Sequence, residues 1–277
     1  MTLSFRPATE VALADIAALF TRAFDGYIAG TRVIAPLDMS EFIFGNNVNL
    51  NLSQIAFDGD QPVALGCVAR QGGTNRLAVM GVDKPYHGKG VGKQLLTELL
   101  SQAHQRGDHT YILEVIEQNV NAVKLYSKMG FEVMERLMGY KTSTLEAAPD
   151  SALEQVDLTE VARIATWYGS PTLPWQVSGP HLMRLSPTNL AYRLDNAYAV
   201  ISNPDAASIR LHAFITLPDY QRQGQGTRLL KALAAKYAGK TWFIPALCPE
   251  QYGGFLLKLG FAQEQLNQFQ MKTAITP

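Results

Sequence analysis

The sequence predicts an α/β (α+β) fold of two similar domains in tandem, each a mixed, mostly antiparallel sheet flanked by helices. Three observations predict it. Strand-like segments come first and are followed by a strand–helix–strand–helix–strand order. A glycine cluster opens a helix in each half, and a later helix ends at a Gly-Phe pair in each half. The chain of 277 residues, 47% of them hydrophobic, is long enough to bury two cores of ordinary size.

The N-terminal segment supplies a strand and a helix. Leu3–Arg6 reads as a short strand, and apolar residues between Val11 and Phe24 recur at helical spacing. The stretch 26–51 is aromatic and rich in Asn and Gly. We expect a second helix at about Ser40–Phe44 inside this stretch.

Three strand-like segments precede the first glycine cluster. Gln54–Phe57 and Val63–Ala69 flank Asp58-Gly59-Asp60, which is typical of a hairpin turn. Arg76–Val82 is the third segment, and the cluster Gly88–Gly92 then opens an amphipathic helix. The pattern therefore predicts a hairpin, a further strand and a helix in direct succession.

The first half closes with a strand, a helix and a strand pair. We expect a strand at Tyr111–Ile116 and a helix at Asn119–Met129, ended by Gly130 as a C-cap residue. Phe131–Glu135 and Leu137–Lys141 are predicted as two paired strands.

The second half repeats this order after a linker. Residues 142–151 (TSTLEAAPDS) are mostly small and polar and include a proline. We therefore expect a first domain at 1–141, this linker, and a second domain at 152–277. The second domain is predicted to contain a helix at about 152–167, strands at 191–194, 197–201 and 208–216, a helix to about 237, a strand at 241–247 and a helix ending at 260.

Two motifs are echoed between the halves in the same order. The segment 85–92 (PYHGKGVG) is answered by 219–226 (DYQRQGQG), and 125–131 (LYSKMGF) is answered by 255–261 (FLLKLGF). Two echoes at similar separation indicate a duplicated domain.

A strand that ends in a glycine-spaced turn at the start of a helix is physically an anion site. Backbone N–H groups point outward there, the helix dipole adds positive charge, and glycine lets a pyrophosphate approach the backbone. No Gly-Lys-Ser/Thr follows the four-residue gap of a Walker loop. Three preceding strands and the short glycine spacing also fit a Rossmann loop poorly.

Residues 82–96 (VDKPYHGKGVGKQLL) resemble the acyl-CoA-binding motif of the GNAT acetyltransferase superfamily. That motif reads Arg or Gln, two residues, Gly, one residue, then Gly or Ala, and His87 stands here where Arg or Gln is usual. The segment 113–131 is similar to the strand and helix that follow in that family, and especially to the branch that acetylates protein N-terminal amines. The resemblance covers about 5–141, and more weakly 152–272.

The resemblance implies an acetyl-CoA-dependent N-acetyltransferase that uses acetyl-CoA as co-substrate and no metal. It implies direct transfer to a primary amine in a ternary complex, with Glu114 as base and Tyr126 as acid. The residues implied in coenzyme binding are Met80, Gly81, Val82, His87, Gly88, Lys89, Gly90, Val91, Gly92, Lys93 and Asn119.

The chemistry of acetyl transfer explains these residue types. The attacking amine must lose a proton, because an alkyl ammonium has a pKa of about 10. A strand-end carboxylate such as Glu114 can accept that proton directly or through water, and a Tyr126 hydroxyl can protonate the departing thiolate. Each residue also has a plainer interpretation: Glu114 as a solvent-facing strand residue with Glu117 as substitute, Tyr126 as a packed aromatic, and Asn119 as an N-cap.

The second copy keeps the glycine loop at Arg222–Thr227 and loses the acid and the base. An ungapped count back from Gly260 aligns the following pairs: Tyr126 with Leu256, Glu114 with Ile244, and Asn119 with Pro249. We therefore expect a degenerate, shorter second domain that supports the fold, and whether its loop binds coenzyme A stays open.

The composition of the chain limits the kinds of partner that we expect it to bind. Lys+Arg and Asp+Glu are 24 each, so there is no net charge to favour nucleic acid. No apolar stretch approaches the roughly 20 residues of a membrane span, and the start lacks a signal-peptide pattern. We expect a cytoplasmic monomer or homodimer without nucleic acid, membrane or metal, whose acceptor is a small-molecule amine or a peptide N-terminus.

Two alternatives to this function stay open. A non-catalytic acyl-CoA sensor would need only the glycine loop, so the presence of Glu114, Asn119 and Tyr126 together favours an enzyme. An acetyltransferase for a small amine or an antibiotic would use the aromatic stretch as an acceptor pocket, unless those rings are simply core. The rings concerned are Phe24, Tyr27, Phe42 and Phe44.

Overall fold

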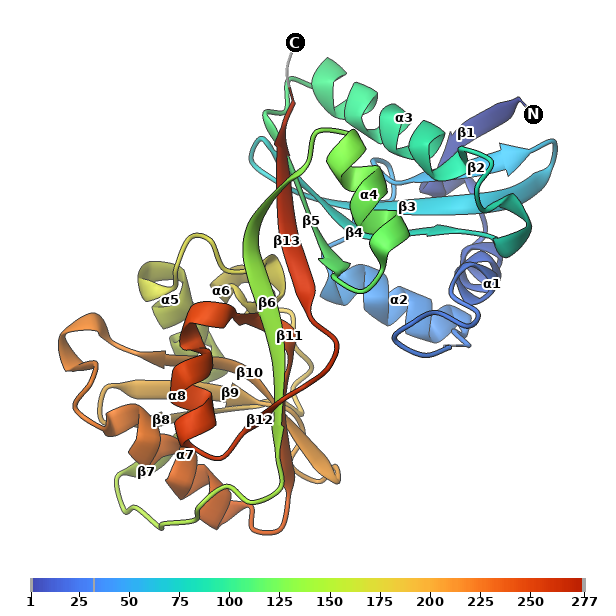
Figure 1. Cartoon of the computed structure of the whole chain (residues 1–277). Coiled ribbons are helices and arrows are strands. Elements are labelled where there is room, and N and C mark those ends of the chain that lie inside the picture. Colours follow the sequence, from blue (N-terminus) through green and yellow to red (C-terminus); the bar gives the residue numbers. More distant parts are fainter. Residues whose placement is uncertain (1, 32, 276–277) are drawn as a thin grey trace. The chain divides into compact units, whose positions relative to one another are not determined.

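The computed structural model describes residues 2–31 and 33–275, which form two compact units. The first unit comprises Met1–Met134 and Phe269–Pro277, and the second comprises Glu135–Gln268. Each unit is a sheet with helices on both faces (Figure 1). The predicted α/β fold with two similar units is confirmed.

The sheet of the first unit runs in the order β1-β2-β3-β4-β5-β13. Neighbouring strands from β1 to β4 are antiparallel, whereas β4 and β5 are parallel. The strands are β1 (Leu3–Pro7), β2 (Gln54–Asp58), β3 (Gln61–Gln71), β4 (Thr74–Val82), β5 (Thr110–Ile116) and β13 (Gln268–Ala274).

Helices α1 (Leu13–Ala23) and α2 (Pro36–Gly45) pack on one face of this sheet, and α3 (Val91–Gln105) and α4 (Val120–Lys128) pack on the other. The helical spacing of apolar residues explains why α1 packs on the sheet, because Ile16, Leu19 and Phe20 form one buried stripe on this helix. The second helix is longer than expected because Pro36 can occupy the first turn and Asp38 accepts the N–H of Ala35.

The second unit has strand order β6-β11-β10-β9-β8-β7, with β12 paired to β6. Its strands are β6 (Glu132–Thr142), β7 (Leu153–Val156), β8 (Leu190–Leu194), β9 (Ala197–Ile201), β10 (Ser208–Thr216), β11 (Thr241–Pro249) and β12 (Ala262–Gln263). Its helices are α5 (Leu158–Tyr168), α6 (Gly179–Leu182), α7 (Gln225–Lys236) and α8 (Gly253–Lys258).

Two local predictions were wrong. The strand pair expected at 131–135 and 137–141 is the single strand β6, which continues to Thr142. The helix expected from 152 begins only at Leu158, because 153–156 pairs with β8 and Asp157 then caps the helix by accepting the N–H of Thr159.

The units divide the chain differently from the expected boundaries at 141 and 152. The last strand, β13, hydrogen-bonds to β5, and its Met271 is buried in the core of the first unit. Conversely, Met138 and Tyr140 of β6 are buried in the core of the second unit, where β6 pairs with β11. Sheet pairing, not sequence order, therefore decides which unit each of these strands completes, and 142–151 lies inside the second unit.

Candidate active site

The glycine cluster of the first unit forms a turn at the start of α3. Gly88 and Gly90 have φ of +72° and +81°, which favours glycine, and α3 begins immediately afterwards at Val91. Lys89 and Lys93 are exposed beside this turn. The structure therefore gathers the expected loop residues 87–93 at one helix N-terminus, an arrangement that suits a phosphate group.

His87 ties this loop to the end of β4. Its ring Nε2 lies 2.8 Å from the carbonyl oxygen of Val82, so Nε2–H donates to that oxygen. The side chain is exposed apart from this bond. The residue that departs from the family motif thus has a defined contact, namely one that orients the loop.

Strands β4 and β5 separate beside the loop. Their parallel pairing runs from Thr74–Thr110 to Leu77–Leu113, although β4 continues to Val82 and β5 to Ile116. A β-bulge at Ala78 sits where the pairing stops, since Leu77 faces Val68 and Val79 faces Cys67 on β3. Bulges bend strands and are over-represented next to active sites. The sheet is therefore open between the C-terminal parts of β4 and β5, and we name this opening the splay.

Backbone groups of β4 line the splay. Asp83 donates its N–H to Val63, so alternate residues of β4 pair with β3. By this alternation Gly81 pairs with β3, whereas Met80 and Val82 direct their backbone groups toward the splay. Of these three residues, which were expected to bind the coenzyme, Met80 and Val82 therefore offer backbone groups, and Gly81 does not.

Tyr126 of α4 belongs to the buried hydrophobic cluster against which Met80 and Val82 of β4 pack. The side chain is buried against Phe131, with ring centroids 5.8 Å apart. Burial raises the pKa of the Tyr126 hydroxyl, and Tyr27 raises it further. Tyr27 follows α1, which packs on the opposite face of the sheet. A tyrosine held protonated suits a hydrogen-bond donor.

Glu114 is held by a residue that the sequence did not single out. Arg76 Nε and Nη2 donate to Glu114 Oε2 at 2.9 and 2.8 Å, and the two side chains are only 4% and 3% exposed. Arg76 Nη1 also lies 3.4 Å from Asn46 Oδ1 at the end of α2. The interpretation of Glu114 as a solvent-facing strand residue is therefore wrong. The sequence could have indicated Arg76 as the partner of Glu114 only if the parallel pairing of β4 with β5 had been known.

The other two polar candidates occupy the turn between β5 and α4. Asn119 caps α4, because its Oδ1 accepts the N–H of Ala122 at 3.2 Å. Glu117 is partly buried in the same turn. The capping interpretation of Asn119 is thus confirmed, and its contact with a coenzyme stays a prediction.

Aromatic rings close the α1 side of the splay. Phe24 stacks on Phe20 at 4.5 Å and meets Tyr27 edge-on at 5.1 Å. A Cβ on Gly81 would lie 2.8 Å from the Phe24 ring, so glycine is needed for this close approach. Of the expected acceptor rings, Phe24 and Tyr27 adjoin the splay, Phe42 packs near Phe20, and Phe44 is exposed.

The second unit repeats the backbone of this site. The parallel pairing of β10 with β11 stops at Arg210–Phe243, and a bulge at His212 follows, as at Ala78. Gly224 has φ +80°, and Arg222 adopts +60° at the place of Gly88. Leu256 does replace Tyr126, because each accepts the N–H of the phenylalanine five residues later.

The register corrects one aligned pair. Arg76 pairs with Ile112 in the first unit and Arg210 pairs with Phe243 in the second. Glu114, two residues beyond Ile112, therefore corresponds to Pro245, and the alignment with Ile244 was wrong by one residue. Neither residue can act as a base.

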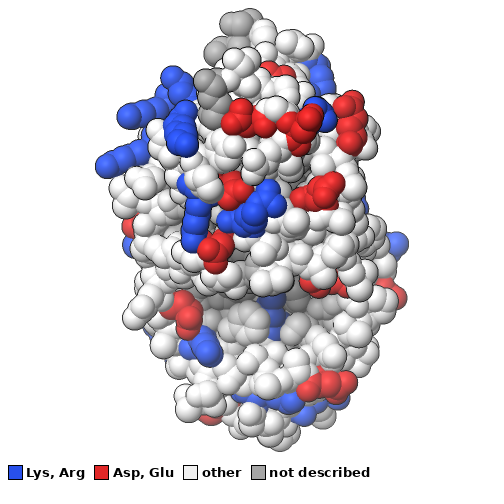
Figure 2. Space-filling model, turned by 90° about the vertical axis from the view of Figure 1, so that its right-hand side faces the viewer, with Lys and Arg blue, Asp and Glu red and all other residues white. Residues whose placement is uncertain are grey.

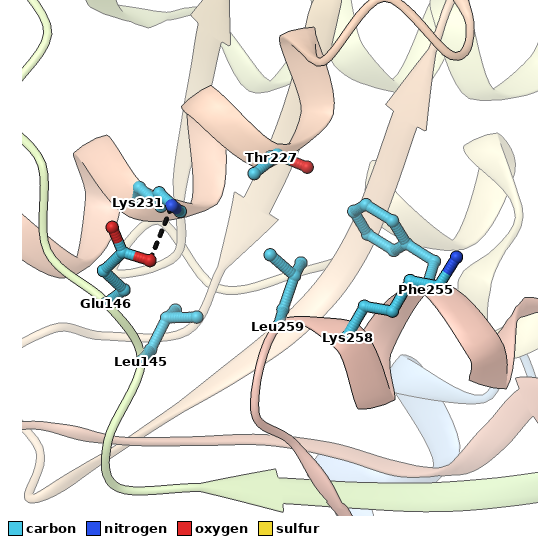
Figure 3. A pocket seen from close by; sticks show the side chains of 7 residues that line it. All are labelled: Leu145, Glu146, Thr227, Lys231, Phe255, Lys258 and Leu259. Carbon is cyan, nitrogen blue, oxygen red and sulfur yellow. Dashed lines mark hydrogen bonds and ion pairs between the residues drawn. The ribbon is translucent and has the colours of Figure 1, made fainter.

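A pocket of about 300 Å³ lies between α7 and α8 in this unit (Figure 3). Lys231 at its edge donates to Glu146 at 2.6 Å, which draws the segment 145–146 across the opening. The lining residues are Leu145, Glu146, Thr227, Lys231, Phe255, Lys258 and Leu259.

Three further features concern metal ligands, membrane spans and surface charge. No group of three or more His, Cys, Asp or Glu among residues 2–31 and 33–275 is placed to hold a metal ion. No helix within these ranges is long and apolar enough to cross a bilayer. On the face drawn in Figure 2, basic and acidic side chains are interspersed.

Residues 33–140 match the family model described as an acetyltransferase (GNAT) domain. Over 75 residues, 27% of the chain, the sequence is 35% identical to the uncharacterized N-acetyltransferase YobR of Bacillus subtilis (strain 168), covering 30% of that protein. Over 52 residues, 19% of the chain, it is 42% identical to the ribosomal protein bS18-alanine N-acetyltransferase of Haemophilus ducreyi, covering 36% of that protein. The chain thus spans about a third of the length of these relatives.

Several solved structures are similar over nearly the whole chain, among them a GCN5-related N-acetyltransferase from Sphaerobacter thermophilus, with a TM-score of 0.68 at 11% identity over 99% of this chain and 96% of that one. The tandem GNAT protein from the clavulanic acid biosynthesis pathway superposes with a TM-score of 0.68 at 14% identity, over 100% of this chain and 99% of that one. At this identity the likeness shows the fold alone. Residues 33–140 are thus similar to a GNAT acetyltransferase domain, and the whole chain has the fold of a tandem GNAT protein.

Proposed function

We propose that the first unit transfers the acetyl group of acetyl-CoA to a primary amine by direct attack in a ternary complex. The observation that carries the proposal is the splay, because the glycine loop follows β4 directly and Tyr126 belongs to the cluster against which Met80 and Val82 of β4 pack. An extended thioester-bearing chain can enter between two strands that have stopped pairing and bond to the backbone as an added strand would.

The coenzyme would lie along β4. The loop 87–93 would take its pyrophosphate at the N-terminus of α3, and Met80 and Val82 would bond its amide groups. His87 holds the loop against Val82, so it acts as a positioning residue. Asn119 fixes the start of α4 and thereby the placement of Tyr126.

Tyr126 would serve the leaving group. When the tetrahedral intermediate collapses, the C–S bond breaks and its electron pair stays on sulfur. The Tyr126 hydroxyl protonates that thiolate or hydrogen-bonds to it. Its raised pKa keeps the hydroxyl protonated and makes it a weaker acid, which favours the hydrogen bond to the thiolate over full proton transfer.

Glu114 would accept the proton of the attacking ammonium through a water molecule. Its side chain is 3% exposed and one oxygen is bound by Arg76, so direct contact with an acceptor is disfavoured. Arg76 would keep the carboxylate oriented toward the splay as a positioning residue.

The acceptor would be a peptide N-terminus or a small amine. The matched relative in Haemophilus ducreyi is named for the alanine of a ribosomal protein, and it supports the N-terminal-amine branch. The aromatic wall and the exposed apolar residues Ile28, Val33 and Leu37 near it favour an acceptor with an apolar body. The rival function, an acyl-CoA sensor, would use the loop without turnover.

The test is thiol release from acetyl-CoA with pooled amines and short peptides, comparing the wild type with Tyr126→Phe. We expect acceptor-dependent release that falls at least tenfold in the variant, since general acid catalysis contributes about 10²–10⁴-fold. Tyr220→Phe, an exposed tyrosine in the second unit, is the matched control and should keep full activity. Coenzyme binding without release from any pool would favour the sensor.

A further inference from the structure

The pocket between α7 and α8 of the second unit is built from residues that the proposed acetyl transfer does not use. Its volume of about 300 Å³ lies at the lower end of the range of small-molecule sites. The lining comes from three parts of the chain, namely the segment 145–146, the first two turns of α7, and the end of α8 (Figure 3). The pocket can therefore hold a small organic molecule.

The floor of the pocket is apolar. Leu145, Phe255 and Leu259 line it, and all three pack against the hydrophobic core of the second unit. Each of them is only partly buried, so part of its apolar surface stays open to solvent. Because covering such surface is favourable, the floor suits a ligand with an apolar body.

The edge of the pocket at Lys231 already binds a carboxylate. Lys231 Nζ donates to Glu146 Oε2 at 2.6 Å, and the two side chains are 25% and 72% exposed, so solvent reaches both. Exposed ion pairs contribute little stability. The lining also holds a second lysine, Lys258, against this one carboxylate, so its formal charge is positive. A ligand anion can therefore replace Glu146 on Lys231 at small cost.

The chain that follows Glu146 is held on α7 by other bonds. Ala148 donates its N–H to the carbonyl oxygen of Lys231 at 3.1 Å, and Arg228 binds Asp150 at 2.7 Å. These bonds do not involve the Glu146 side chain. The exchange therefore requires only that one exposed side chain turns away, and the backbone can stay in place.

We propose that this pocket binds a small molecule with one carboxylate and an apolar body, of the kind represented by a medium-chain fatty acid. The carboxylate takes the place of Glu146 on the Lys231 ammonium. Thr227, four residues earlier on the same face of α7, donates its hydroxyl to the second carboxylate oxygen. The apolar body lies over the floor.

A carboxylate is favoured over a phosphate for a reason of charge. A carboxylate exchanges one for one with that of Glu146, whereas a phosphate brings a second negative charge beside the displaced Glu146 side chain. The binding is non-covalent, and it is independent of the acetyl transfer proposed for the first unit.

Octanoate is the probe for this pocket. The measurement is a ¹H–¹³C spectrum of the full chain, labelled at its leucine methyl groups and titrated with octanoate at constant ionic strength. We expect saturable shifts of the Leu145 and Leu259 signals with a millimolar dissociation constant, on the order of what a ten-atom ligand reaches. Octylammonium, which has the same chain and the opposite charge, should give none.

Variants of the ion pair test the assignment. Lys231→Met keeps the apolar stem of the side chain and should weaken octanoate binding at least tenfold, whereas Lys231→Arg should retain it. Glu146→Gln removes the internal competitor and should tighten binding several-fold. Lys236→Met changes a lysine of the same helix outside the pocket, so it is the matched control and should leave the affinity unchanged.

The following results would overturn the proposal. Leu145 and Leu259 signals that do not shift in the wild type show that the pocket takes no such acid. Equal affinity in Lys231→Met places the carboxylate elsewhere, and unchanged affinity in Glu146→Gln rejects the exchange. Shifts with adenosine 3′,5′-bisphosphate alone make the pocket a nucleotide site. None of these readouts involves acetyl transfer, so their failure is distinct from failure of the proposed function.

Discussion

The two units share a backbone motif and fill it with different side chains. In the first, Met80 of β4 and Leu125 of α4 lie near Gly92, and a Cβ there would meet Leu125 at an ordinary 3.4 Å. In the second, Phe214 and Phe255 hold the equivalent positions. Their rings stack at 5.5 Å with 19° between planes, and a Cβ on Gly226 would lie 2.7 Å from Phe214.

The comparison shows that the bulge and the splay are features of the backbone common to both units. The side chains that stand beside the splay differ between the units, and we expect them to decide whether a ligand can enter it. Both sheets stop pairing at the same place, since the bulges at Ala78 and His212 turn the strand in the same way. Aliphatic side chains stand beside Gly92 in the first unit, and a stacked aromatic pair holds the equivalent positions in the second. The second unit, which has this aromatic pair, also lacks counterparts of Tyr126 and Glu114.

The largest expected effect on turnover comes from giving the splay of the first unit the aromatic pair that the second unit has. Met80→Phe with Leu125→Phe should reduce acetyl-CoA turnover at least a hundredfold, because the rings would stack where the thioester enters. Steady-state thiol release measures it, and circular dichroism checks the fold. The reciprocal pair, Phe214→Met with Phe255→Leu, should leave turnover unchanged, and turnover that survives the first pair would contradict the proposed entry.

The second prediction contrasts the two arginines. Arg76→Met should cost about 3–5 kcal/mol of unfolding free energy, because it leaves the Glu114 carboxylate buried without its cation. Arg210→Met removes a guanidinium that has no ion pair among residues 2–31 and 33–275, so it should be neutral or stabilising. Urea denaturation of both variants measures the contrast. Equal destabilisation would show that Arg210 has an internal counter-ion after all.

The third prediction concerns acid sensitivity of the second unit. His212 has a folded pKa of about 3 and an ordinary unfolded value near 6.5, so between these the unfolded state binds the additional proton. Stability should therefore fall as pH drops below 6.5, by about 2 kcal/mol between pH 7 and pH 5. Thermal melts of the wild type and His212→Gln measure it. A variant curve parallel to the wild type would exclude His212 as the cause.

The smallest expected effect is at His87. His87→Ala removes the bond to the Val82 carbonyl and should raise the KM for acetyl-CoA several-fold, equivalent to about 1 kcal/mol. His87→Gln keeps a donor and should restore the KM. A kcat change without a KM change would assign His87 to the chemical step instead.

Much of the fold and part of the site followed from local sequence. The glycine turn before α3, the Asn119 cap and the burial of Tyr126 lie in segments whose spacing and turn residues are strong. The helix expected from 152 failed because tertiary pairing with β8 overrode a weak helical pattern. The partner of Glu114 was missed because Arg76 is 38 residues away, and only strand register brings the two together.

The sequence by itself therefore determined most of the element types and the phosphate-type loop, because each depends on residues within a few positions of one another, and the echoed motifs indicated the duplication. Tertiary structure alone decided which unit β6 and β13 complete, where β4 and β5 part, and that Arg210 lacks the carboxylate of its counterpart. These are matters of register between distant strands, and a shift of one residue turns a side chain to the opposite face of the sheet.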